Sequence, residues 1–137
     1  MNAEAVQRLR VTFSQSGALR YVGHLDMVRT WERGLRRAGA PLAYSEGFHP
    51  HPKVAFSAAL PVGEESLGEY LDVELWREVD ARALQAALLA TVAEGMEVLD
   101  VTEVELRAPS LMGSVAGGIW RVVLPGVADL AERVARA

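Results

Sequence analysis

The sequence predicts an α+β fold, in which strands and helices follow one another along the chain. Apolar residues recur at every second position in several segments, which is the period of a half-buried strand. In two other segments they recur at every third or fourth position, which is the period of an amphipathic helix. At 137 residues, 50% of them hydrophobic and 23% charged, the chain has room for one domain and part of another. The three tryptophans, Trp31, Trp76 and Trp120, are expected to anchor the core.

The first half of the chain predicts a strand, a helix and a second strand. Residues 8–13 alternate polar and apolar side chains, as expected of a strand with one buried face. A helix is expected to begin after Gly23 and to end near Gly39, because glycine is a common C-terminal cap and Pro41 blocks any continuation. Residues 53–57 form the second expected strand.

The second half predicts a strand, a helix and a fourth strand. Residues 68–76 alternate acids with large apolar residues and give the clearest strand pattern in the chain. Asp80 is expected to cap a helix, which Gly95 closes. Residues 96–105 form the fourth expected strand.

The predicted elements therefore run strand, helix, strand, strand, helix, strand over residues 1–106. Each half contains a strand–helix–strand crossover, and crossovers within one sheet are right-handed. The simplest closed arrangement is a ferredoxin-like βαββαβ domain, which has an antiparallel sheet with two helices on one face. A mixed α+β sandwich would use the same elements in a different strand order.

The composition changes after Leu106. Residues 107–118 are rich in glycine and serine and predict a linker or mobile loop. A further strand is expected at 119–124 and a helix at 129–137. These elements, at 119–137, indicate either the start of a second copy of the fold in a truncated chain, or an extra strand of the first sheet whose edge the helix covers.

The composition also excludes several kinds of protein. The chain has no cysteine, so it can form no disulfide, no thiol nucleophile and no cysteine-ligated zinc or iron–sulfur site. No apolar run approaches the roughly 18 residues that span a bilayer, and residues 1–10 are too polar for a secretory signal. We therefore expect a cytoplasmic protein without a membrane segment.

Charge is distributed unevenly along the chain. The net charge is −4, yet residues 1–53 carry eight basic and four acidic residues, whereas residues 54–137 carry six basic and fourteen acidic ones. Such a distribution can steer an anionic partner to one face even when the whole molecule is acidic. The alternative is that these charges form ordinary solvated faces.

Half of the basic residues in the first segment share one side of the first predicted helix. Arginine suits phosphate contacts, and aromatic rings or an imidazole beyond the helix can stack on bases. The alternative is a solvent-facing helix surface in which Glu32 and Arg36 form an ordinary i,i+4 pair. The residues to which we assign nucleic-acid or anion binding are Arg29, Arg33, Arg36, Arg37, Tyr44, Phe48, His49 and Lys53.

The three histidines are candidates for acid–base catalysis. A neutral histidine near pH 7 is a suitable general base for activating an RNA hydroxyl. Imidazole and carboxylate groups also bind zinc, iron or manganese, but the spacing here is no known metal motif, so no metal and no other cofactor is expected. The catalytic candidates are His24, Asp26, His49 and His51.

Four motifs together resemble a known family. They are GHLD at 23–26, YSEGFHPHPK at 44–53, LPVG at 60–63 and GEYLD at 68–72. The sequence is similar to the radical-SAM-associated (radical-SAM-linked) protein family, a domain of unknown function that is fused to, or encoded beside, radical SAM iron–sulfur proteins. The resemblance runs over residues 8–124, and members of that family tend to be longer.

The resemblance implies a radical SAM protein as the partner, in trans or as a fusion. This chain lacks the cysteine triad that binds a radical SAM cluster, so it cannot itself be the radical enzyme. We expect an accessory or substrate-binding module, rather than an enzyme, that recognises RNA or another anionic substrate. Tandem ferredoxin-like domains occur in RNA-binding proteins, including the repeat-processing endoribonucleases of CRISPR systems. The alternative is a metal-independent ribonuclease-like enzyme that uses His24 or His49.

Overall fold

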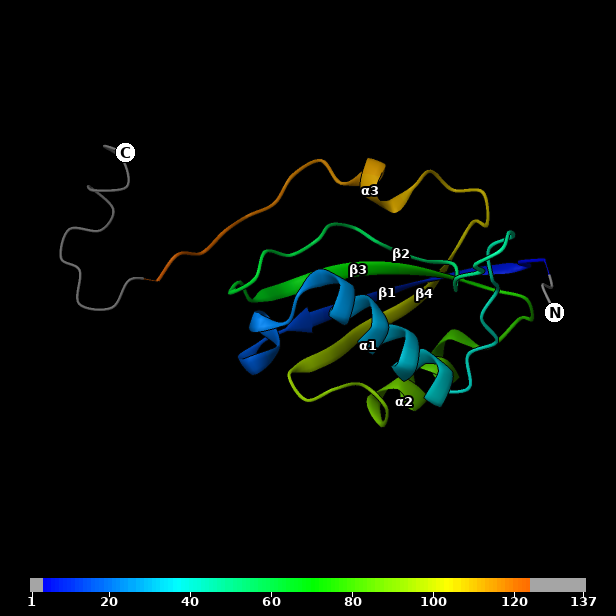
Figure 1. Cartoon of the computed structure of the whole chain (residues 1–137), viewed down its shortest axis with the longest axis horizontal. Coiled ribbons are helices and arrows are strands. Elements are labelled where there is room, and N and C mark those ends of the chain that lie inside the picture. The colour runs from blue at the N-terminus through cyan, green and yellow to red at the C-terminus, as the bar shows by residue number, and fades with distance from the viewer. Residues whose placement is uncertain (1–3, 124–137) are drawn as a thin grey trace.

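The computed structural model describes residues 4–123 of the chain (Figure 1). It contains a four-stranded antiparallel sheet together with helices, which confirms the α+β class. No helix within residues 4–123 is long and apolar enough to cross a membrane. The elements in chain order are β1 (Gln7–Gln15), the 3-10 helix η1 (Gly17–Tyr21), α1 (His24–Arg37), β2 (Val54–Phe56), β3 (Ser66–Leu75), α2 (Ala81–Leu89), β4 (Met96–Val104) and α3 (Leu111–Ser114).

The strands lie in the order β2-β3-β1-β4, so β1 and β3 form the centre of the sheet. These two strands pair along most of their length, with Leu9 opposite Val73 and Val11 opposite Leu71. β2 is short and lies at one edge beside β3, and β4 forms the other edge beside β1. Because side chains alternate along each strand, this register places the apolar residues of both central strands on one face.

The hydrophobic core lies between that face and the two longer helices. Helix α1, which crosses in front of the sheet in Figure 1, contributes Met27, Trp31 and Leu35. Helix α2 contributes Leu84 and Leu88. All five side chains are 5% exposed or less. Their three- and four-residue spacing gives each helix one apolar stripe, and both stripes face the same side of the sheet.

Specific capping residues set the ends of the helices. Gly39 follows α1 with a φ of +83°, in the left-handed region that favours glycine. The expectation that Gly95 closes α2 was wrong, because α2 ends at Leu89 with Ala90 as its cap, and Gly95, with a φ of +93°, forms the turn before β4. The side chain of Asp80 accepts a hydrogen bond from the backbone N–H of Arg82, as predicted for the cap of α2. Gly95 has a second constraint, because a Cβ there would lie 2.6 Å from the carbonyl oxygen of Ser16.

The opposite face of the sheet carries a buried ion cluster. Arg8 and Arg10 of β1 both donate hydrogen bonds to the carboxylate of Asp72 on β3, which is 2% exposed. Arg8 also donates to the carbonyl oxygens of Ala108, at 2.8 Å, and Pro109, at 3.1 Å. One guanidinium group therefore joins the sheet to the segment that follows β4.

The segment after β4 differs from the sequence-based expectation. Residues 107–118 include the short helix α3, whose Leu111 is 3% exposed and which contacts β2 and β3. The strand expected at 119–124 is not found, because residues 119–123 form neither strand nor helix and pair with no strand of the described chain. The helix expected at 129–137 lies outside the described residues, and a second copy of the fold is not confirmed.

Only one of the three tryptophans is a core residue. Trp31 is completely buried, whereas Trp76 is 45% exposed and Trp120 is 72% exposed. Trp76 follows Leu75, whose side chain occupies the core, so strand alternation directs Trp76 to the other face. Trp120 lies in the segment that pairs with no strand. The expectation of three core tryptophans was therefore wrong for two of them.

Asp72→Asn is expected to lower the free energy of unfolding by about 3 kcal/mol, because it leaves the buried guanidinium group of Arg8 and the partly exposed one of Arg10 without a counter-charge. Burial of Asp72 acts to raise its pKa, but hydrogen bonds from Arg10 and Arg8 outweigh burial and hold the pKa below its usual value. The stabilisation is therefore complete above the usual carboxyl pKa and is lost as the pH falls through the lowered value. Urea denaturation at neutral and acidic pH measures both effects.

The matched control is Asp100→Asn, which removes the same charge from an exposed position on β4. It is expected to change stability little. An equal loss of stability in the two variants would show that the buried cluster does not stabilise the fold.

Candidate functional site

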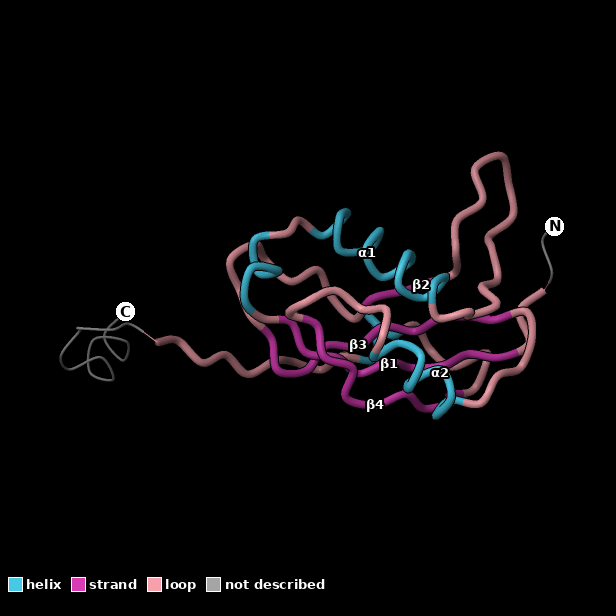
Figure 2. The backbone as a smooth tube through the Cα atoms, turned by 90° about the horizontal axis from the view of Figure 1, so that it is seen from below, coloured by secondary structure: helices cyan, strands magenta, loops and turns pink. Residues whose placement is uncertain are grey.

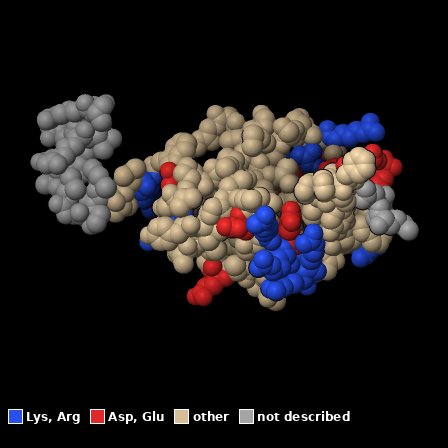
Figure 3. Space-filling model, in the orientation of Figure 1, with Lys and Arg blue, Asp and Glu red and all other residues tan. Residues whose placement is uncertain are grey.

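A basic surface runs along α1. Arg29, Arg33, Arg36 and Arg37 are all exposed and lie on the side of the helix opposite to the buried Trp31. Figure 3 shows basic side chains gathered over this helix. We call these four residues the arginine face.

Two members of the arginine face have partners within the described residues. Arg29 Nη1 lies 3.7 Å from Asp26 Oδ1. Arg36 donates hydrogen bonds to the hydroxyl oxygen of Tyr44 over 3.2 and 3.3 Å. The other two arginines form no ion pair within residues 4–123, and the Glu32–Arg36 pair of the alternative interpretation is not formed there. Most of the positive charge on this face is therefore available to a partner.

The loop between α1 and β2 carries the predicted aromatic contact residues. A bridge between Tyr44 and Pro52 closes its base, and the N–H of Ser45 donates to the carbonyl oxygen of His51 over 2.8 Å. Phe48 lies between these residues and is fully exposed. Figure 2 shows the loop projecting from the body of the molecule. Because Tyr44 also contacts the arginine face, the base of the loop is joined to that surface.

Lys53, which was expected to act with the arginines, lies on a different face. It precedes Val54, whose side chain packs against the core, so strand alternation directs Lys53 to the outer face of the sheet. There Lys53 and His51 line a groove of about 600 Å³ between α3 and the sheet. Lys53 is therefore not part of the arginine face.

The structure also separates the catalytic candidates. His24 begins α1, His49 is exposed in the loop, and His51 lines the groove. Asp26 lies near Arg29 and forms no hydrogen bond with His24 within residues 4–123. In the part of the chain that the structure describes, no cluster of three or more histidine, aspartate or glutamate side chains is placed to hold a metal ion. The candidates therefore do not form one site.

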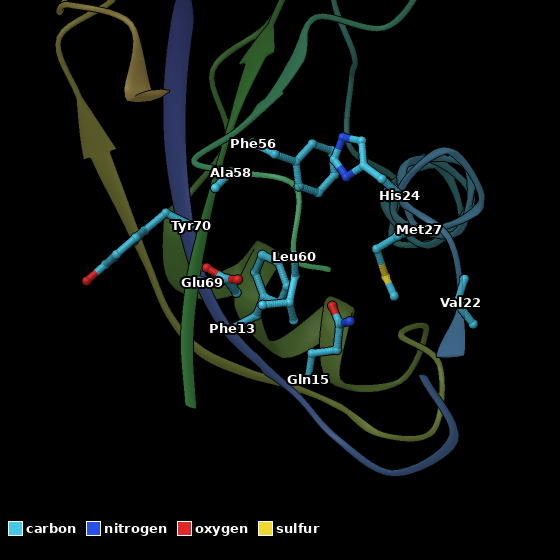
Figure 4. Close-up of a pocket in the computed structure, with 10 residues that line it drawn as sticks. All are labelled: Phe13, Gln15, Val22, His24, Met27, Phe56, Ala58, Leu60, Glu69 and Tyr70. Carbon is cyan, nitrogen blue, oxygen red and sulfur yellow. The ribbon is translucent and has the colours of Figure 1, made fainter. Parts of the chain in front are cut away.

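His24 lines a small cavity of about 20 Å³ beneath the start of α1 (Figure 4). Phe13, Met27 and Phe56 are among its apolar lining residues. The imidazole of His24 meets the ring of Phe56 edge-on, with 5.5 Å between the ring centroids. We call this the His24 cavity.

Two further polar residues, which the sequence analysis missed, line the His24 cavity. Gln15 is 5% exposed at the end of β1, and Glu69 is half-buried on β3. Neither side chain, nor that of His24, forms a hydrogen bond or ion pair within residues 4–123. Burial raises the pKa of Glu69 above its usual value.

The sequence contained a signal for Glu69. Leu71, Val73 and Leu75 are fully buried and occupy every second position of β3, so the side chains at these odd-numbered positions face the core. Glu69 occupies the next position of this series, on the core side of the strand, whereas Asp72 lies on the other face of the sheet. An acid on the core side of a strand is unusual and marks a position where the core gives way to a polar site.

The described part of the chain is thus an α+β domain with a basic helix surface and a small cavity lined by unpaired polar groups. Residues 8–136 match the family described as uncharacterized protein conserved in bacteria (DUF2344), and the chain belongs to that family. No curated protein matches the chain. The expected membership of a domain family of unknown function is confirmed, and the association with radical SAM proteins stays a prediction.

Glu69→Gln is expected to raise the melting temperature by a few degrees at about pH 8 and to have little effect at about pH 4. A raised pKa in the folded state means that the native protein binds the proton more tightly than the unfolded chain does. The wild-type protein therefore loses stability as the pH rises through the window between the two pKa values, whereas the glutamine variant does not. Thermal unfolding of both proteins across this range measures the difference.

Glu94→Gln is the matched control, because Glu94 is exposed and lies outside the His24 cavity. This variant should follow the wild-type pH profile. A stabilisation by Glu69→Gln that is equally large at both pH values would contradict the burial of an ionisable carboxyl group.

Proposed function

We propose that this chain is an accessory module that binds RNA for a radical SAM protein, present in trans or as a fusion partner. The observation that carries the proposal is the arginine face, a row of exposed guanidinium groups beside a projecting aromatic loop. The radical chemistry would belong to the partner, because this chain has no cysteine with which to bind an iron–sulfur cluster.

The chemistry of the arginine face suits a phosphate backbone. Guanidinium groups are always charged and present several N–H donors to a phosphate. Arg33 and Arg37 have no ion-pair partner within residues 4–123, so a phosphate that binds them displaces no carboxylate. Arg36 is held in place by Tyr44. Phe48 adds an exposed ring on which an unpaired base can stack.

We also propose that the sheet with α1 and α2 is a ferredoxin-like unit. The strand order β2-β3-β1-β4 and the packing of both helices against one face support this. A fold of this kind hosts many unrelated functions, so the RNA proposal rests on the arginine face and not on the fold.

Docking to a radical SAM protein requires a contact surface, and the segment 119–123 offers one. Four apolar side chains there are each 64% exposed or more, namely Ile119, Trp120, Val122 and Val123. Contiguous exposed apolar side chains are typical of protein interaction sites. The four motifs at 23–26, 44–53, 60–63 and 68–72 support the identity of the partner.

The double variant Arg33→Ala, Arg37→Ala is expected to bind a structured, tRNA-sized RNA about tenfold or more weakly at low salt. Each lost phosphate contact should also lower the slope of log affinity against log salt by about one, so the slope should fall by about two. Titration of RNA into both proteins at several salt concentrations measures the two effects.

A matched control is Arg82→Ala, Arg107→Ala, which removes the same charge from exposed positions outside the arginine face. Equal losses in the two double variants would indicate a general charge effect. An unchanged affinity in the Arg33, Arg37 variant would remove the arginine face from the proposal. If the wild-type protein binds no RNA even at low salt, the proposed function is wrong.

A second proposal is a metal-independent, ribonuclease-like activity that uses His24 or His49. Its support is the His24 cavity, in which an imidazole and a carboxyl group line one space. His24 is exposed, so in its neutral form it would act at the mouth of the cavity, where it would accept the proton of a ribose 2′-hydroxyl. The 2′-oxygen would attack the adjacent phosphorus, and the 5′-oxygen would leave and take a proton from water. His24→Ala is expected to abolish RNA cleavage, seen on a gel, without loss of the circular dichroism spectrum of the fold. Cleavage that survives in both His24→Ala and His49→Ala would contradict this proposal.

A further inference from the structure

The His24 cavity plays no part in the proposed RNA binding and suits a different kind of ligand. Gln15, His24 and Glu69 line it from three separate elements, β1, α1 and β3 (Figure 4). None of these side chains has a hydrogen-bond partner within residues 4–123. His24 is exposed and Glu69 is half-buried, and within residues 4–123 only the indole N–H of Trp31 is a side-chain polar group buried without a partner. The polar groups of Gln15, His24 and Glu69 are therefore accessible and free to bind a ligand.

The size of the cavity limits what that ligand is. Its volume is about 20 Å³. One water-sized group needs about 10 to 15 Å³ on the same measure, so the cavity accommodates a single small polar group. A nucleobase or a sugar ring is too large to enter it.

The charge of the lining limits the ligand further. The lining residues include one carboxyl group, that of Glu69, and no lysine or arginine. A cation placed beside this carboxyl group would offset the cost of its burial. Phe13 and Phe56 add aromatic rings, which attract a cation over their faces.

We propose that the His24 cavity binds the ammonium group of a primary alkylamine. An ammonium group carries three N–H donors and no acceptor. The acceptors would be the carboxylate of Glu69, the amide oxygen of Gln15 and a ring nitrogen of His24, since all three residues line the cavity. The cavity has room for the ammonium group alone, so the alkyl chain would extend out of it past apolar lining residues such as Leu60.

Two sources present this chemistry, a free alkylamine and the lysine side chain of a polypeptide. n-Butylammonium stands for the first, and Nα-acetyl-lysine methylamide stands for the second. Binding of both indicates that the cavity also accepts lysine within a chain. Binding of n-butylammonium alone indicates that the flanking peptide groups are excluded.

The test is isothermal titration calorimetry of n-butylammonium chloride into the full chain, at the ionic strength of a sodium chloride blank. The wild-type protein is expected to bind with a Kd of about 1 mM, which is reasonable for so small a ligand. Glu69→Gln should weaken binding about tenfold or more, because a hydrogen bond to a charged group is lost. Tetramethylammonium has the same charge but no N–H donor and should not bind.

Two further observations guard against a nonspecific result. Glu94→Gln, which removes an exposed carboxyl group outside the cavity, should retain the wild-type affinity. In the wild-type protein, n-butylammonium should shift the side-chain amide resonances of Gln15. The proposal is overturned if the wild-type protein does not bind n-butylammonium, if it binds tetramethylammonium equally well, or if Glu69→Gln binds as tightly as the wild-type protein does.

Discussion

The carboxylate of Asp72 joins parts of the chain that lie far apart in sequence. It lies on β3, accepts hydrogen bonds from Arg8 and Arg10 on β1, and through Arg8 is linked to the carbonyl oxygens of Ala108 and Pro109. Two positive charges around one negative charge are tolerated because the side chain of Arg10 is 27% exposed and reaches water. Because Arg8, Arg10 and Asp72 lie on the outer face, the middle of the inner face is apolar, and α1 and α2 pack against it.

Helix α1 therefore links the fold to both candidate sites. Its apolar stripe is buried, its opposite side is the arginine face, and its first residue, His24, lines the cavity. The packing of Trp31 has a cost, because its indole N–H is buried without a hydrogen-bond partner within residues 4–123. Such a donor costs about 1 to 3 kcal/mol. The ring of Trp31 packs against that of Phe13, with 4.6 Å between centroids, and this contact helps to offset the cost.

Local periodicity made much of the fold predictable, since alternation at 8–13 and helical spacing after Gly23 depend only on neighbouring residues. The exposure of the arginine face follows from the same spacing. The His24 cavity could not be predicted in this way, because Glu69 and His24 line one space only after β3 has paired in the sheet and α1 has packed on it. Residues 119–123, part of a strand expected from their apolar pattern, do not form one, because an apolar run forms a strand only beside a neighbour that satisfies its backbone.

The loop that carries Phe48 is fixed to the sheet at its base. The N–H of Ala43 donates to the carbonyl oxygen of Glu74 over 2.9 Å, and the N–H of Lys53 donates to the carbonyl oxygen of Ala43 over 2.8 Å. These bonds hold the register of β2 independently of the residues between them. Substitutions at residues 46–49 should therefore leave the core undisturbed. The exposed ring of Phe48 is thus carried by a loop whose tip adds nothing to the pairing of β2 with β3, so the tip and the fold are separable.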